Sequence, residues 1–166
     1  MTEAYIYDAI RTPRGKGRAD GALHEVTAAR LSAIALNAMK DRNNLEGHAV
    51  EDVIWGNVTQ VGEQGGCLAR TTVLASDLDE RIPGLSINRF CASGLEAVNQ
   101  AAAQVMSGMS DFAIGGGVDY AYWITDNLCI NNDYFVLEEE GQIVAGLQAH
   151  HAHWSIERMP GLAITV

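Results

Sequence analysis

The chain has 166 residues, of which 48% are hydrophobic, and its formal net charge is -10. This length and apolar content predict one ordinary globular domain with a buried core, not a disordered segment. A surface this acidic repels phosphate backbones, so we expect no nucleic-acid partner.

The N-terminal residues and the cysteine spacing bear on the cellular compartment of the protein. The first residues lack a basic stretch followed by an apolar run, so no signal peptide is expected. No apolar run approaches the ~18 residues that a membrane helix needs. The cysteines, at unrelated spacings and without a Cys-x-x-Cys pair, are Cys67, Cys91 and Cys129. These features predict a cytoplasmic protein with no membrane segment, no disulfide framework and no structural zinc site.

Strand and helix patterns alternate along the first 118 residues. The predicted strands are 4–10, which has the composition of a buried strand, 52–58, 84–90 and 111–116. The predicted helices are 27–40, 67–76 and 93–107. Thr27 is the expected N-cap of the first helix. This alternation predicts an α/β fold with a mixed, mostly parallel sheet.

The predicted helix 93–107 is apolar on several faces, and Glu96 is its only charged residue. A helix that is apolar on nearly all faces is usually buried by other elements on more than one side. A single sheet covers one side. A second layer, a second domain or a second chain is therefore expected on the other.

The composition changes near residue 119. Residues 1–118 hold 14 acidic and 10 basic side chains, whereas residues 119–166 hold 7 acidic and 1 basic. We therefore divide the chain into an α/β domain, 1–118, and a divergent acidic tail, 119–166. Within the tail, a strand is predicted at 134–137 and a helix at 142–154.

Cys91 lies where a predicted strand ends and a predicted helix begins. Free amides and the dipole at a helix N-terminus stabilise a thiolate, and the same amides can donate to a thioester oxyanion. The small neighbours Ala92, Ser93 and Gly94 let a substrate approach. Cys91 is therefore a candidate nucleophile and the thiol expected to react fastest. The alternative is a packed and inert core thiol.

The residues around Cys91 resemble the acyl-enzyme signature of the thiolase family. The matching residues are Ile87, Asn88, Cys91, Ala92, Ser93, Gly94, Leu95, Ala97, Val98 and Val105. Segments 8–13 and 61–66 resemble the first strand and a later connection of the same family. The resemblance covers about residues 3–118.

The resemblance implies a fold, a reaction and partners. The fold is one incomplete half of a thiolase, with helices on both faces of the sheet and the helix 93–107 as one of a central pair. The activity is that of an acyl-CoA C-acyltransferase, either an acetyl-CoA acetyltransferase or a 3-ketoacyl-CoA thiolase, with Cys91 as nucleophile in a ping-pong reaction. The substrate is an acyl-CoA, no cofactor is needed, and the chain forms a homo-oligomer or self-associates.

Other features depart from the family. The Gly-His-Pro histidine and the Cys-x-Gly cysteine that complete its acid–base machinery have no counterpart. Where the family motif Gly-Gly-x-Glu ends in glutamate, this chain has Asp119. The chain is therefore expected to be a truncated or frame-shifted thiolase, or one with a divergent end. The alternative function is a non-catalytic remnant that folds poorly or acts as an interaction module.

Two side-chain clusters are weaker candidates. A His-x-His pair, which is a possible metal-ligand pattern, lies among His150, His151 and His153. A small basic cluster, a candidate contact for a CoA phosphate, comprises Arg11, Arg14, Lys16 and Arg18. Neither pattern is specific, and a solvated surface explains both. No metal site is predicted.

Overall fold

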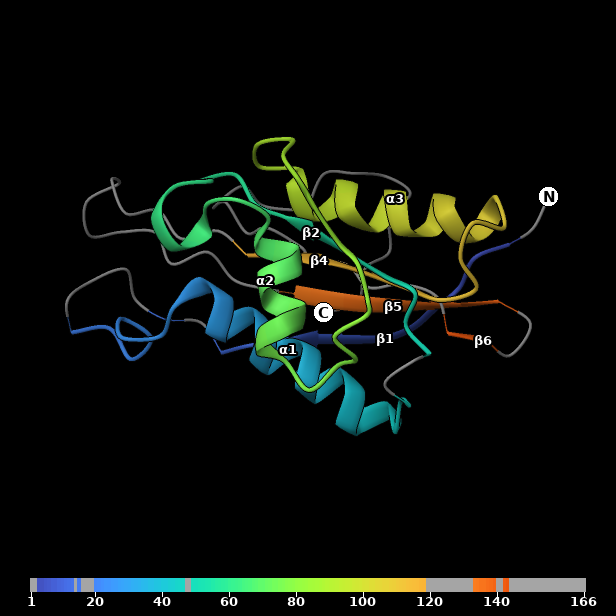
Figure 1. The fold of residues 1–166 in the computed structure, drawn as a ribbon, viewed down its shortest axis with the longest axis horizontal. Coiled ribbons are helices and arrows are strands. Elements are labelled where there is room, and N and C mark those ends of the chain that lie inside the picture. Colours follow the sequence, from blue (N-terminus) through green and yellow to red (C-terminus); the bar gives the residue numbers. More distant parts are fainter. Residues whose placement is uncertain are drawn as a thin grey trace, which may run out of the picture.

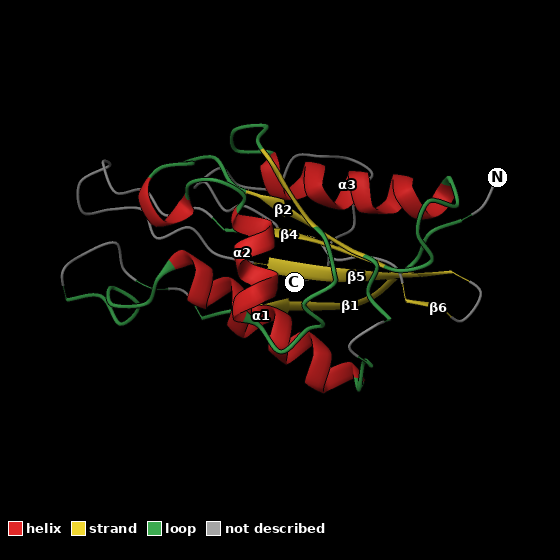
Figure 2. Cartoon of the chain, viewed as in Figure 1, coloured by secondary structure: helices red, strands yellow, loops and turns green. Residues whose placement is uncertain are grey.

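The computed structural model describes residues 3–13, 15, 20–46 and 49–118, and the backbone of 133–139 and 142–143. Its elements, in chain order, are β1 (Ile6–Arg11), α1 (Ala28–Asn43), β2 (Asp52–Gly56), the 3-10 helix η1 (Gly62–Gln64), α2 (Leu68–Ala75), β3 (Gly84–Ile87), α3 (Ser93–Met106), β4 (Ala113–Gly117), β5 (Asp133–Glu139) and β6 (Gln142–Ile143). Strands alternate with helices from β2 to β4 (Figure 2), which confirms the α/β prediction.

The parallel sheet has the strand order β3-β2-β4. In the central strand β2, Ile54 stands opposite Leu85 of β3 and Gly115 of β4. The chain leaves β2 for β3 through α2 and then passes back over β2 to β4 through α3. Because such crossovers are right-handed, reversing direction puts the two helices on opposite faces. Figure 1 shows α3 on one side of the strands and α1 with α2 on the other.

Large side chains fill the face of the sheet that α1 and α2 cover. Val53 and Trp55 of β2 belong to one buried cluster with Leu36 and Met39 of α1. The Trp55 indole is fully buried, and its Nε1 donates to the Oγ of Ser32 on α1 at 3.1 Å. This face therefore has a dense apolar core, and the polar indole nitrogen buried within it is hydrogen-bonded.

The other face of the sheet carries α3 over mostly small side chains. Ile54 of β2 and Ala113 of β4 pack with Ala97 and Ala101 of the helix. On the outer face of α3, by contrast, the side chain of Leu95 is 51% exposed. The cover expected on a second side of this helix is therefore not supplied within the part of the chain that the structure describes.

The start of α1 is held by two side chains. The Thr27 hydroxyl accepts from Arg30 N at 3.1 Å, which confirms the predicted N-cap. In addition, Glu63 Oε1 of η1 accepts from Ala28 N at 3.0 Å, a cap supplied from 35 residues away. This second bond ties the loop after β2 to the first turn of α1.

β1 differs from the buried strand predicted at 4–10. The side chains of Tyr5, Ile6 and Tyr7 are about half exposed, at 47%, 52% and 49%. The reason is its position: β1 pairs antiparallel with β5 instead of joining the β3-β2-β4 sheet. Ile10 is the β1 residue that packs against the core of the α1 face.

The tail contributes backbone to the same sheet as β1. The strand predicted at 134–137 is present as β5, and β5 pairs with β6. Residues 142–143 are therefore strand, not the start of the helix predicted at 142–154, because their backbone pairs with β5. The other residues of that helix lie outside the described ones, and the domain boundary at 118 stays a prediction. In the described residues no helix is both long and apolar enough to cross a membrane.

Candidate active site

The turn that carries Cys91 begins earlier than the sequence predicts. β3 ends at Ile87, so residues 88–90 of the predicted strand 84–90 are not strand. Instead, the Asn88 side-chain oxygen accepts from Phe90 N at 2.9 Å, and Phe90 adopts a left-handed backbone with φ of 48°. A local side-chain bond of this kind competes with strand pairing and redirects the chain. Cys91 is the next residue.

Ser93 holds the same turn from the helix side. It is the first residue of α3 and is buried. Its Oγ donates to the Phe90 carbonyl at 2.6 Å and accepts from Arg89 N at 2.8 Å. The backbone N of Ser93 also donates to the Phe90 carbonyl, at 2.9 Å. Ser93 therefore holds the turn through two backbone groups, the Arg89 amide and the Phe90 carbonyl.

The turn is also tied to the neighbouring loop and to α3. Asn88 Nδ2 donates to the Val58 carbonyl at 3.1 Å, which links it to the segment after β2. Arg89 forms an ion pair with Glu96 of the first α3 turn, with 3.3 Å between Nη2 and Oε1. An acidic side chain near a helix N-terminus is favourable. The Arg89 side chain of this pair is exposed, whereas the Glu96 side chain is largely covered.

Gly56 allows α3 to come this close to the sheet. A Cβ at Gly56, the last residue of β2, would lie 2.5 Å from the carbonyl carbon of Ser93 and 2.6 Å from the nitrogen of Gly94. Any other residue would therefore push the first turn of α3 outward. The absence of a side chain at this position helps to place Cys91 at the carboxyl end of the sheet.

Cys91 is exposed and lies two residues before the first residue of α3. The alternative of a buried core thiol is therefore wrong, because that reading requires a packed sulfur. The position beside a helix N-terminus is the one that the sequence indicates. The role of Cys91 as nucleophile stays a prediction.

Cys67 is a second exposed thiol at a helix start, and sequence reasoning gave it no role. It immediately precedes α2, and its Sγ lies 3.2 Å from the Gly84 carbonyl and 3.7 Å from Ser86 Oγ. Partial burial raises the pKa of Cys67, but hydrogen bonds from the Arg70 amide and from Ser86 outweigh it, so this pKa lies below its ordinary value. The signal was available, since Cys67 is the first residue of the predicted helix 67–76.

Cys67 lies beside β3, in contact with Gly84 and Ser86, whereas Cys91 follows the strand's last residue by four positions. The His24 ring bonds to the carboxylate of Glu25 at 2.8 Å. Outside the described residues lie Arg14, Lys16, Arg18, Cys129, His150, His151 and His153. Within the described part of the chain, no three His, Cys, Asp or Glu side chains gather as a metal-binding group.

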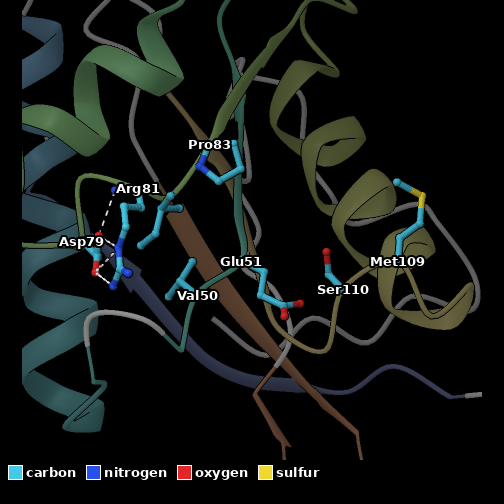
Figure 3. A pocket seen from close by; sticks show the side chains of 8 residues that line it. Val50, Glu51, Asp79, Arg81, Pro83, Met109 and Ser110 are labelled. Atoms are coloured by element: carbon cyan, nitrogen blue, oxygen red, sulfur yellow. Dashed lines mark hydrogen bonds and ion pairs between the residues drawn. The ribbon is translucent and has the colours of Figure 1, made fainter.

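An open pocket of about 510 Å³ lies at the other end of the sheet from Cys91 (Figure 3). Its lining comes from the loops that precede β2, β3 and β4, and it includes Glu51, Arg81 and Met109. Arg81 is already paired with Asp79 at 2.6 Å, and Glu51 accepts from the Asp111 amide. The charged groups of this pocket are thus engaged within the protein, and the pocket is remote from the thiol.

The fold and the turn together define a class: layered α/β domains that present a cysteine between a strand and a helix over the sheet. Residues 4–121 match the family model described as the thiolase N-terminal domain. The chain therefore belongs to the thiolase family, and the resemblance of its first 118 residues is confirmed.

Named relatives support this assignment. The chain is 41% identical over 121 residues to a 3-ketoacyl-CoA thiolase of Shewanella loihica, an alignment that covers 72% of this chain and 31% of the relative. It is also 41% identical over 118 residues to the steroid 3-ketoacyl-CoA thiolase FadA6 of Mycobacterium tuberculosis, covering 71% and 28%.

A solved structure shows the same fold. The acetyl-CoA acetyltransferase of Bacillus anthracis superposes with a TM-score of 0.65 at 35% identity, covering 71% of this chain and 29% of that one. The thiolase-like fold predicted from the sequence is therefore confirmed. The matched region spans less than a third of the length of these relatives.

Proposed function

We propose that this chain carries the acyl-accepting part of a thiolase, with Cys91 as the residue that receives the acyl group from a CoA thioester. The observation that carries the proposal is the exposed Cys91 thiol in a braced turn two residues before α3. A nucleophile needs both access and a group that stabilises its anion, and a helix N-terminus supplies the second.

The proposed step conserves its atoms and charges. The Cys91 thiolate attacks the thioester carbonyl carbon, and the negative charge moves to the carbonyl oxygen. In this proposal, amides of the first turn of α3 donate to that oxygen, as donors at a helix N-terminus can. The bond from carbon to the CoA sulfur then breaks, CoA leaves as a thiolate that takes up a proton, and the acyl group remains on Cys91 as a new thioester.

Completion of the cycle requires proton transfer at a second substrate. The family resemblance assigns activation of the nucleophile to a Gly-His-Pro histidine and the acid–base work to a Cys-x-Gly cysteine, and neither motif occurs in the 166 residues. General acid–base catalysis is worth ~10²–10⁴-fold. We therefore propose that the isolated chain takes up an acyl group but shows no appreciable thiolysis of acetoacetyl-CoA.

The substrate class and setting follow from the same proposal. Acyl-CoA is the substrate, no cofactor takes part, and the chain works in the cytoplasm as a homo-oligomer. The described surface supports association, because Phe90 and Leu95, which lie close together along the chain at the start of α3, are large apolar side chains at 77% and 51% exposure.

A non-catalytic interaction module is the second candidate. The observation that favours it is the open outer face of α3, where Leu95 and Met106 are about half exposed. Under this alternative Cys91 would have no acyl chemistry, and the helix face would be the functional surface.

Acyl capture separates the two candidates. The purified chain is incubated with acetyl-CoA at neutral pH, and the modified residue is mapped by peptide mass spectrometry. We expect one acetyl group on Cys91, lost in Cys91→Ala and retained in the matched control Cys67→Ala. Absence of acetylation at Cys91 under conditions where the chain is folded would contradict the proposal.

A further inference from the structure

The backbone before Cys91 is strained. Phe90 and Asn44 are the two non-glycine residues with positive φ among the described ones. Asn44 ends α1, where a left-handed residue is ordinary and asparagine tolerates it. Phe90 lacks a short polar side chain, so the same conformation is unfavourable for it.

Two side chains offset this strain. Asn88 Oδ1 accepts from the Phe90 amide at 2.9 Å, and Ser93 Oγ donates to the Phe90 carbonyl at 2.6 Å. Both peptide groups that flank the strained φ and ψ angles are therefore bonded to side chains. Strained residues persist when their surroundings over-determine them, and they concentrate at functional sites.

We propose that Asn88 and Ser93 form a clamp that holds Phe90 left-handed and so positions the Cys91 thiol at the start of α3. Both are positioning residues, since they act on Cys91 through the backbone of Phe90. The inference rests on the proposed function for its purpose, although the clamp itself is defined by the bonds around Phe90.

The burial of Ser93 makes it the stronger arm of the clamp. The residue is 5% exposed, and its hydroxyl is satisfied on both sides, by the Arg89 amide and the Phe90 carbonyl. Removing the hydroxyl takes the acceptor from the Arg89 amide and leaves the Phe90 carbonyl with the Ser93 amide alone. The turn then relaxes by moving Phe90 to negative φ, which carries Cys91 away from the helix N-terminus.

The first test measures thiol alkylation in the intact chain. Limiting iodoacetamide labels Cys91 and Cys67, and the ratio of the two rates is read from their peptides, with Cys67 as internal reference. Ser93→Ala should lower the ratio about three- to tenfold, the effect of losing one or two ordinary hydrogen bonds. The matched control is Ser107→Ala, which removes a hydroxyl that donates to a carbonyl at the far end of α3. It should leave the ratio unchanged.

A second substitution separates positioning from simple loss of stability. Asparagine adopts left-handed backbone at little cost, so Phe90→Asn removes most of the strain. In that background Ser93→Ala should change the ratio less than twofold. An equal effect of Ser93→Ala in both backgrounds, or no effect in the original one, would overturn the clamp.

These outcomes are independent of acyl transfer, because iodoacetamide needs no CoA site. If the effect of Ser93→Ala depends on the residue at position 90 but acetyl-CoA does not acetylate the chain, the clamp is supported and the proposed function is contradicted. If Cys91 is acetylated but the effect of Ser93→Ala is the same in both backgrounds, the proposed function is supported and the clamp is contradicted.

Discussion

The two faces of the β3-β2-β4 sheet are built differently. The face under α1 and α2 buries large side chains, with Trp55, Leu36 and Met39 at most 1% exposed. The face under α3 relies on Ile54 and a set of alanines. Small side chains bring a helix axis closer to a sheet but bury less apolar area. The comparison suggests that one face supplies stability and the other places the Cys91 turn.

The open outer side of α3 agrees with this division. Leu95 and Met106 stay about half exposed although α3 is the helix whose N-terminus carries the thiol. A helix held on one side by small residues gains less from burial than α1 does. Substitutions on the two faces should therefore separate global stability from the state of Cys91.

Trp55→Ala should have the largest effect on stability. Truncating a buried aromatic typically costs about 3–5 kcal/mol, a large fraction of the 5–15 kcal/mol that a domain has. Chemical denaturation followed by circular dichroism measures the loss. The control Ile34→Ala removes a side chain that is 42% exposed on the same helix layer and should cost much less. Equal losses in the two variants would contradict the account of the α1 face.

Gly56→Ala should come next and should act on the Cys91 turn. The new Cβ would meet backbone of Ser93 and Gly94 below 2.7 Å, so α3 must shift, and overpacking typically costs about 1–3 kcal/mol. We expect slower alkylation of Cys91 relative to Cys67. Ile54→Val removes a methyl from the same face without a clash and should leave that ratio unchanged, at a cost of about 0.5–1.5 kcal/mol. An unchanged ratio in Gly56→Ala would show that the close approach does not position the turn.

Leu95→Gln should have the smallest effect on stability, within about 0.5 kcal/mol, because the side chain is half exposed. It should nevertheless lower self-association and the fluorescence of a hydrophobic dye, since it removes apolar surface from the outer face of α3. Leu74→Gln is the matched control on α2, where the leucine is 57% exposed. If both variants change light scattering and dye binding equally, the α3 face is not a special surface.

Periodicity and capping predicted most of the parallel α/β core. The helix predicted at 27–40 is Ala28–Asn43 and that at 67–76 is Leu68–Ala75, because apolar spacing and the Thr27 cap are local signals. The strand predicted at 111–116 is Ala113–Gly117. The family signature likewise pointed to Cys91 as the residue at the start of α3.

Tertiary interactions decided what the sequence did not predict. The exposure of β1 depends on its pairing with β5, far along the chain. The early end of β3 depends on Asn88 and Ser93, whose hydrogen bonds override the strand propensity of Phe90. The environment of Cys67 comes from Ser86 and Gly84, which its local sequence does not reveal.

The two exposed thiols give the sharpest contrast for the central claim. The lowered pKa of Cys67 favours its thiolate at neutral pH, so alkylation alone does not distinguish an acyl carrier from an activated bystander. Folded Cys67 should therefore react faster than unfolded Cys67 at pH values below the ordinary thiol pKa, and this difference should vanish once the pH rises above that ordinary value, where both forms are thiolate. Acyl transfer also needs donors for the oxyanion, so acetylation is a stricter readout than alkylation.

The most direct test of Cys91 as the acyl carrier is therefore a comparison of two reagents on the same folded chain. Limiting iodoacetamide and limiting acetyl-CoA are applied in parallel, and the modified fraction of Cys91 and of Cys67 is measured by peptide mass spectrometry. The account predicts that iodoacetamide labels both thiols, whereas the acetyl group is found on Cys91 and is lost when the chain is unfolded in urea. Acetylation of Cys67 in the same proportion as its alkylation, or at a higher level than Cys91, would contradict it.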